Sequence, residues 1–164
     1  MTERIYCKRA GEVKKNKSKI EKETGVKIII DGGNVEFSGG SVEEYEAGII
    51  LDAIDFGFTA KQALVLADEG RMFRKIHIRG YTKRNLKAVR SRLIGIEGKT
   101  RRTIEDISNC KVLITESDVG IIGDTEDVTH AATAVINIIK GSKQSNMYAY
   151  LEKMNRIKKS LAGL

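Results

Sequence analysis

Two glycines separated by two residues stand directly before a cluster of basic residues. They are Gly95 and Gly98, and Lys99, Arg101 and Arg102 follow them. Because glycine has no Cβ and adopts positive φ readily, the backbone here can approach a ligand closely. A turn of this kind presents backbone N–H groups at the start of a helix, where the helix dipole favours phosphate. The spacing predicts a clamp for a nucleic-acid backbone, whose charge the three basic side chains would neutralise.

The same segment imitates a nucleotide-binding P-loop. That motif requires a glycine five positions before the second one, following a strand, but Leu93 stands there. Leu86, Val89 and Leu93 recur at helical spacing, which disfavours a strand before the turn. An ATP or GTP site therefore fits the residues less well than the clamp. A plain glycine turn joining two helices remains the simpler alternative.

The distribution of charge favours a localised anionic partner. The chain has 164 residues and a formal net charge of +7. Residues 83–102 contain eight Lys or Arg and one Glu, so this segment alone carries a net +7, and the rest of the chain is balanced. A concentrated excess of this kind is typical of a nucleic-acid contact.

Nothing in the sequence predicts an enzyme. No nucleophile–base arrangement and no metal-ligand spacing is present, so we expect no catalytic residues, no metal and no cofactor. The two cysteines, Cys7 and Cys110, form no paired motif, which favours a reduced, cytoplasmic setting. No apolar run reaches transmembrane length, and the first residues lack the apolar core of a signal peptide, so we expect no membrane association.

The chain contains an internal repeat, since a shift of 84 residues aligns two segments without a gap. The aligned identities are Ile20 with Ile104, Glu21 with Glu105, Lys27 with Lys111, Ile30 with Ile114, Val35 with Val119, Gly39 with Gly123, Ala47 with Ala131, Ile54 with Ile138, and Gly57 with Gly141. Each copy predicts a short helix, a strand, a turn, a second strand and an amphipathic helix. The expected strands are 27–30 and 35–38 in the first copy and 111–115 and 119–122 in the second.

Further signals define the remaining elements. Ser41 and Glu44 form a capping-box pattern at the start of the last helix of the first copy, and Asp124 or Thr125 can cap its counterpart. Glycines at 57 and 141 end these two helices. The second copy begins earlier, with a strand near 74–79 and a basic helix near 83–93. A helix over 59–69 joins the copies, and an amphipathic helix over 146–161 ends the chain.

These elements and motifs resemble the K-homology (KH) domain, a module that binds RNA and single-stranded DNA. KH domains carry Ile-Gly-x-x-Gly, an isoleucine six residues past the second glycine, and a Thr-Gly-x-Lys-Ile-like run into a strand. This chain has Ile94-Gly95-Ile96-Glu97-Gly98, then Ile104, then Ser108 to Val112; the first copy has Thr24-Gly25-Val26-Lys27-Ile28. Arg101 departs from the pattern, because many KH domains place an apolar residue there.

The resemblance implies an α+β fold of two packed KH-like units of type I. Each would have a three-stranded antiparallel sheet backed by helices, and a C-terminal helix would follow. Residues 1–70 would form a degenerate first unit with a linker helix, and residues 71–164 a second unit with an intact loop. In the second unit, residues 95–98 would hold single-stranded RNA, Ile94 and Ile104 would form an apolar floor, and the strand at 112–114 would form the opposite wall. The implied RNA-binding residues are Ile94, Gly95, Ile96, Glu97, Gly98, Lys99, Thr100, Arg101, Arg102, Ile104, Val112, Leu113 and Ile114.

The first copy departs more strongly. The repeat aligns Gly11 with Gly95, but Lys14 with Gly98, so the second glycine is missing. Too few residues precede Gly11 for both a strand, expected near 4–8, and a helix. We expect this unit to serve as structure or as a protein-binding surface. Its basic residues Lys14, Lys15, Lys17 and Lys19 would at most be secondary RNA contacts, a solvated helix face being the simpler reading.

The chain also resembles a narrower family, the archaeal relatives of the KH protein called partner of the Nob endonuclease. The features that carry this resemblance are the two KH units, the Gly-Lys-Thr-Arg variant of the loop and the length of the chain. The resemblance implies non-catalytic binding of small-subunit ribosomal RNA near its 3′ end during processing and assembly. It also implies contact with the processing endonuclease and the dimethyladenosine methyltransferase as partners. Two alternatives stay open: a general KH regulator of messages, and a protein-binding scaffold with incidental RNA contact.

Overall fold

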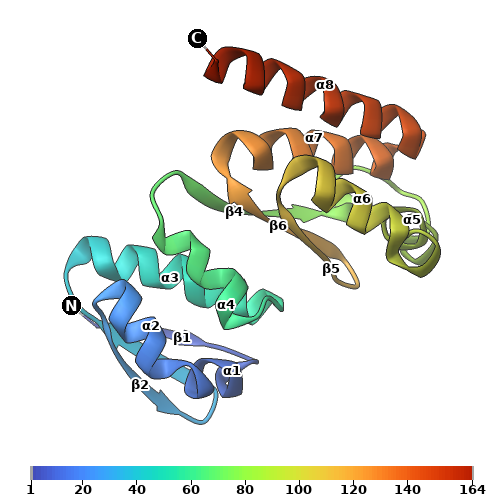
Figure 1. Cartoon of the computed structure of the whole chain (residues 1–164). Coiled ribbons are helices and arrows are strands. Elements are labelled where there is room, and N and C mark those ends of the chain that lie inside the picture. Colours follow the sequence, from blue (N-terminus) through green and yellow to red (C-terminus); the bar gives the residue numbers. More distant parts are fainter. Residues whose placement is uncertain (1, 164) are drawn as a thin grey trace. The chain divides into compact units, whose positions relative to one another are not determined.

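The computed structural model describes residues 2–163, and these fall into two compact units. Unit 1 extends to Phe73 and unit 2 begins at Arg74, so strand β4 (Arg71–His77) runs across the division. Each unit is a three-stranded antiparallel sheet backed by helices (Figure 1). The α+β class and the C-terminal helix expected from the sequence are confirmed. No helix among the described residues is long and apolar enough to cross a membrane.

Unit 1 has the sheet order β1-β3-β2. Its elements are β1 (Thr2–Tyr6), α1 (Ala10–Lys15), α2 (Lys17–Thr24), β2 (Lys27–Asp31), β3 (Asn34–Ser38), α3 (Ser41–Phe56), α4 (Ala60–Ala63) and a 3-10 turn (Leu64–Ala67). The expected apolar face of α3 is fully buried at Ala47, Ile50, Leu51 and Ile54. Gly57 ends α3 at a φ of 140°, a conformation that only glycine adopts without strain.

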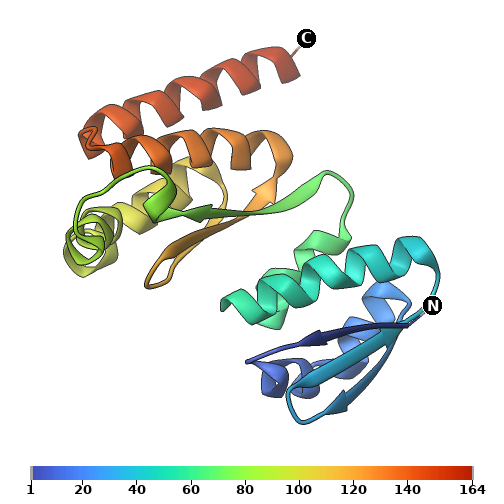
Figure 2. The same ribbon diagram turned by 180° about the vertical axis from the view of Figure 1, so that it is seen from behind.

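Unit 2 has the sheet order β4-β6-β5, in the same sequence arrangement. Its elements after β4 are a 3-10 turn (Ile78–Gly80), α5 (Leu86–Ile94), a 3-10 turn (Ile96–Gly98), α6 (Lys99–Ser108), β5 (Lys111–Ile114), β6 (Asp118–Asp124), α7 (Thr125–Lys140) and α8 (Gln144–Ala162). As Figures 1 and 2 show, α8 lies along α7, and it packs on α6 and α7. The final helix therefore covers the helical layer of its own unit.

The repeat is visible in matched hydrogen bonds. In unit 1 the Glu21 carboxylate accepts the backbone N–H of Ile28 at 2.8 Å, and in unit 2 Glu105 accepts that of Val112 at 2.9 Å. Each bond ties a helix to the strand that follows it, and each occurs at positions 84 residues apart. We call these two contacts the helix–strand bonds. They show that the aligned identities reflect one shared local structure.

Several local expectations were wrong. The capping-box pattern at Ser41 does not cap α3: Gly40 is the N-cap, and the Glu44 carboxylate instead accepts the Gly39 N–H. Asp124 is the N-cap of α7, as expected from the sequence, although its side chain makes no capping bond. A complete capping box occurs at Thr59 and Gln62, where none was expected.

The linker helix and the C-terminal helix also differ in detail from what the sequence predicted. The helix expected over 59–69 is the single turn α4 followed by a 3-10 turn. In α8 the predicted apolar stripe is buried only at Leu151, whereas Ile157 and Leu161 are 43% and 61% exposed. Hydrophobic spacing thus located α8 but overestimated how much of its stripe is covered.

Candidate nucleic-acid interface

The glycine loop joins two helices, α5 and α6, and its backbone has an uncommon conformation. Gly95, Glu97 and Gly98 have φ values of 77°, 54° and 78°. A Cβ on Gly95 would lie 2.6 Å from the backbone nitrogen of Thr100, so glycine is required there to let the loop fold back on the start of α6. A P-loop would need a strand before the loop, and α5 occupies that position.

The loop leaves the first turn of α6 available to a ligand. Gly98 is the N-cap of this ten-residue helix and supplies no side-chain oxygen to its N–H groups. Uncapped N–H groups at a helix start carry a partial positive charge that attracts phosphate. Ile96 is 87% exposed at the tip of the loop, and Lys99 is exposed beside it. The predicted residues 95–99 therefore form one accessible surface.

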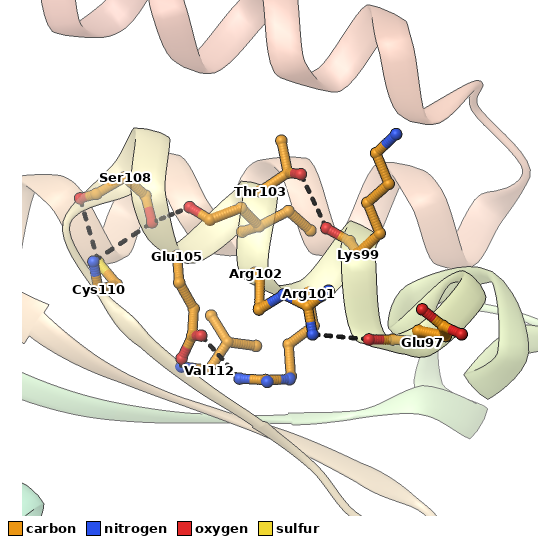
Figure 3. A network of polar contacts seen from close by, with 10 residues as sticks. Glu97, Lys99, Arg101, Arg102, Thr103, Glu105, Ser108, Cys110 and Val112 are labelled. Carbon is orange, nitrogen blue, oxygen red and sulfur yellow. Dashed lines mark hydrogen bonds and ion pairs between the residues drawn. The ribbon is translucent and has the colours of Figure 1, made fainter.

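The three basic side chains that follow the loop have different surroundings (Figure 3). Arg102 donates from Nη1 to the carbonyl oxygen of Glu97 at 2.6 Å, and this bond ties the loop to α6. Arg101 is half-buried and pairs with the Glu105 carboxylate at 2.6 Å. The Lys99 amine makes no hydrogen bond or ion pair among residues 2–163. Of the three, Lys99 is thus the one whose charge is uncommitted within the described chain.

Glu105 is a positioning residue that the sequence analysis did not assign. One of its oxygens accepts from Arg101 and the other from the backbone N–H of Val112, so it links the basic helix to β5. Figure 3 shows the two contacts converging on this carboxylate. Its identity with Glu21 in the repeat was visible in the sequence and was the signal that could have identified it.

The predicted apolar floor is only partly at the surface. Ile94 is 37% exposed, but Ile104 is 1% exposed and lies in the core. Thr100 and Val112 are also buried, at 7% and 4%. Ile104 lies in the second turn of α6 and is part of the core, so of the two isoleucines only Ile94 presents surface to a ligand.

Strand β5 is the element that the sequence analysis expected on the other side of the candidate interface. It is an edge strand, and Leu113 pairs with Gly120 while Thr115 donates to Asp118. Because hydrogen-bonding direction alternates along an antiparallel strand, the backbone groups of Val112 and Ile114 point to the open edge. The Val112 N–H is taken by Glu105, which leaves its carbonyl and both Ile114 groups directed outward. Edge groups of this kind can read the edges of bases.

Unit 1 lacks the loop altogether. The residues aligned with it form helix α1, and only Asn16 separates α1 from α2. Between β1 and Gly11 there is no counterpart of α5, in line with the small number of residues there. The element that was not predicted is α1, which begins at Ala10 and occupies the positions aligned with the loop. Lys14, Lys15 and Lys19 are exposed and Lys17 is half-buried, so these four lysines flank a helix junction without a glycine turn.

The cysteines do not add reactive chemistry to the interface. Both are free and buried. Burial raises the pKa of the Cys110 thiol to about 11, against a hydrogen bond with Ser108 that acts in the opposite sense. Burial likewise raises the pKa of Cys7. No cluster of three or more potential metal ligands occurs among the described residues.

A loop with positive φ between two helices, next to the edge of a three-stranded antiparallel sheet, defines unit 2 as a KH domain. The family model of the second KH domain of PNO1, a eukaryotic type KH-domain (KH-domain type I), matches residues 72–156. A KH domain-containing protein of Methanocaldococcus jannaschii is 33% identical over 157 residues, which cover 91% of this chain and 68% of that protein. The chain belongs to the PNO1/Dim2 family of KH-domain proteins.

Solved structures extend the similarity to both units. Dim2p from Pyrococcus horikoshii is 30% identical, with a TM-score of 0.83 over 93% of this chain and 99% of that one. Dim2p of the same organism in a complex with a/eIF2alpha and rRNA is 29% identical, with a TM-score of 0.83 over 95% and 94%. The chain spans 48% and 44% of the length of two eukaryotic relatives, RNA-binding proteins called pno1, from Ixodes scapularis and Oryzias latipes.

Proposed function

We propose that unit 2 binds single-stranded RNA in the space between the glycine loop and the edge of β5. The observation that carries the proposal is the loop itself, whose positive φ values place its backbone at the uncapped start of α6. The RNA backbone would lie against residues 95–98 with Lys99 neutralising phosphate, and bases would lie toward Ile94 and the outward groups of Val112 and Ile114. Arg101 and Arg102 would act chiefly by holding the loop and helix in place.

The RNA we propose is small-subunit ribosomal RNA during its processing and assembly. A relative from Pyrococcus horikoshii was solved in a complex with rRNA, and a relative from Emericella nidulans is a pre-rRNA-processing protein. We further propose contact near the 3′ end of the RNA, a cytoplasmic location, and action beside the processing endonuclease and the dimethyladenosine methyltransferase. The protein's contribution in this proposal is binding without catalysis.

The loop is tested by Gly98→Asp, with Gly98→Asn as the matched control. Both residues tolerate positive φ better than most, and a Cβ at this position would first meet the end of the flexible Arg102 side chain, at 3.2 Å. Only Asp adds a negative charge to the phosphate path. We expect Gly98→Asp to weaken binding of a single-stranded 3′-terminal rRNA oligonucleotide by about tenfold or more, and Gly98→Asn by much less. Equal affinities for the two folded variants would remove the loop from the mechanism.

Salt provides a second, independent measurement. If phosphate neutralisation drives binding, the logarithm of the affinity falls linearly with the logarithm of salt concentration, by about 0.7 per phosphate neutralised on a single strand. Replacing Lys99 with Ala would reduce the magnitude of this slope by about 0.7, the contribution of one neutralised phosphate. A flat response to salt would contradict the proposal.

A further inference from the structure

Unit 1 has a surface hollow that the RNA interface does not use. It lies between edge strand β1 and helix α3 and has a volume of about 550 Å³. Ile5 and Phe37 contribute from the sheet, and Tyr45, Gly48 and Ile49 contribute from α3. Figure 2 shows β1 at the edge of its sheet, beneath α3. We call this hollow the β1–α3 groove.

The groove is apolar within and acidic around it. Tyr45 is 72% exposed and Val42, one turn earlier on α3, is 64% exposed, which is a large apolar exposure for one helix turn. Glu3 and Asp52 line the groove together with Glu44. The whole of α3 contains five acidic residues and no Lys, Arg or His, in a chain whose net charge is +7. Two of these residues, Glu44 and Asp52, line the groove with Glu3, and this lining favours a cationic partner over a phosphate backbone.

Strand β1 offers unpaired backbone groups along the same groove. Cys7 donates to the Gly33 carbonyl, and the register pairs Ile5 with Val35. Alternation along the strand then turns the backbone N–H and C=O groups of Arg4 and Tyr6 toward the open edge. An edge with such groups is a template for an added strand, a common mode of peptide recognition.

The repeat shows that unit 2 does not keep this surface open. The position 84 residues after Gly48 is Ala132 on α7, which is fully buried. Gly48 instead lines the groove, and a Cβ built on it would make ordinary contacts of 3.8 Å and 3.9 Å with the Phe37 ring. Because residue 48 has no side chain, the hollow in unit 1 is deeper there. The corresponding residue of unit 2, Ala132, is buried and lines no such hollow.

We infer that the β1–α3 groove binds an extended segment of a partner protein that carries both apolar residues and Lys or Arg on one face of the strand, at every second position. The segment adds as a strand beside β1. The side chains on that face enter the groove, where the apolar ones meet Ile5 and Phe37 and the basic ones face Glu3 and Asp52. A second copy of this chain fits less well, because a symmetric contact would bring two sets of these carboxylates together. The inference does not depend on RNA binding by unit 2.

The test uses the full chain and a displayed library of short random peptides, selected in parallel on the wild-type chain and on Gly48→Leu. Leucine fills the groove without a clash at its first atom. The matched control is Gly11→Leu, which adds the same side chain in α1, where a Cβ meets nothing within 4 Å. We expect peptides whose every second residue is apolar or basic on the wild type and on Gly11→Leu, and none on Gly48→Leu.

An enriched peptide is then synthesised and its affinity measured. Gly48→Leu should weaken it by about tenfold or more, and Glu3→Lys or Asp52→Lys by several-fold. The amides of Arg4 and Tyr6 should exchange with solvent more slowly in the complex. The inference is overturned if enrichment is equal on Gly48→Leu, if the enriched peptides lack basic residues, or if these amides gain no protection. It is also overturned if the free chain forms a dimer that Gly48→Leu abolishes, since the groove would then be a contact between copies.

Discussion

Arg101 and Glu105 lie one helical turn apart on α6 and are joined by an ion pair of 2.6 Å. The second oxygen of the same carboxylate accepts the backbone N–H of Val112. Arg101 is therefore part of a structural link between helix and strand, at a position where KH domains more often have an apolar residue. The ion pair stabilises Arg101 at this position, where an apolar residue would be stabilised by burial.

Loss of the helix–strand bond should loosen β5. We expect Glu105→Ala to lower the free energy of local unfolding by about 1–3 kcal/mol, because the Val112 N–H then lacks its acceptor. Hydrogen exchange at the Val112 amide measures this directly. Glu105→Gln retains an acceptor and should preserve most of the protection. Glu21→Ala should have the corresponding effect on the Ile28 amide of unit 1, and an effect in neither unit would show that the bonds are incidental.

Three basic residues, Lys99, Arg101 and Lys14, should contribute unequally to RNA affinity. Lys99→Ala should weaken binding several-fold, since an uncommitted phosphate contact is worth about 1 kcal/mol. Arg101→Ala should cost less affinity and more stability, because its charge is already paired. Lys14→Ala should change affinity by less than about twofold, as unit 1 has no glycine turn. Titration of a labelled single-stranded RNA with the three folded variants tests the order, and equal losses for Lys14 and Lys99 would mean that both units hold RNA.

The two loop glycines should differ in what they tolerate. Gly95→Ala should destabilise unit 2 by about 2 kcal/mol or more, since the new Cβ is strained at positive φ and also meets the Thr100 backbone. Gly98→Ala, at a φ of 78° and a ψ of 13°, lies in the left-handed helical region, which costs a side chain less than the ψ of 177° at Gly95; without a backbone clash it should cost about 1 kcal/mol. Thermal unfolding of the two variants makes the comparison. A smaller loss for Gly95→Ala than for Gly98→Ala would contradict the geometry described for the loop.

Cys110 should make stability fall at alkaline pH. Its pKa is about 11 in the folded chain against a reference of 9.0, so the unfolded chain loses this proton first as pH rises. The stabilisation is complete below pH 9.0 and decreases above it, by about 1 kcal/mol at pH 10. Denaturation of the wild type and of Cys110→Ala between neutral pH and pH 10 isolates this contribution. A constant difference between the two proteins across that range would exclude it.

Local patterns predicted most of the elements because their causes are local. The glycines at 57 and 141 end α3 and α7 wherever the helices pack, and the buried faces repeat at a spacing that one helix fixes by itself. The partner of a charged side chain is a local property only within one element. Arg101 and Glu105 stand four residues apart on one helix, a spacing at which charged side chains can pair, whereas the bond from the Val112 N–H to Glu105 depends on where β5 lies beside α6.

The burial of individual side chains could not be predicted from the sequence either. Ile94 and Ile104 are identical residues on either side of the loop, yet one is at the surface and the other in the core. The loop with its positive φ values separates them, so no single helical period relates the two positions. Helix α1 was missed for a related reason: an alignment without gaps assigns its residues to a loop that unit 1 does not have.

The single residue between α1 and α2 has a consequence for stoichiometry. With one glycine loop of this kind among residues 2–163, the proposed RNA binding is monovalent, and no second site raises the local concentration of the strand after it dissociates. Dissociation should follow one exponential, and the rate should not depend on how long the RNA is. The chain would hold its RNA through the contacts of unit 2 alone.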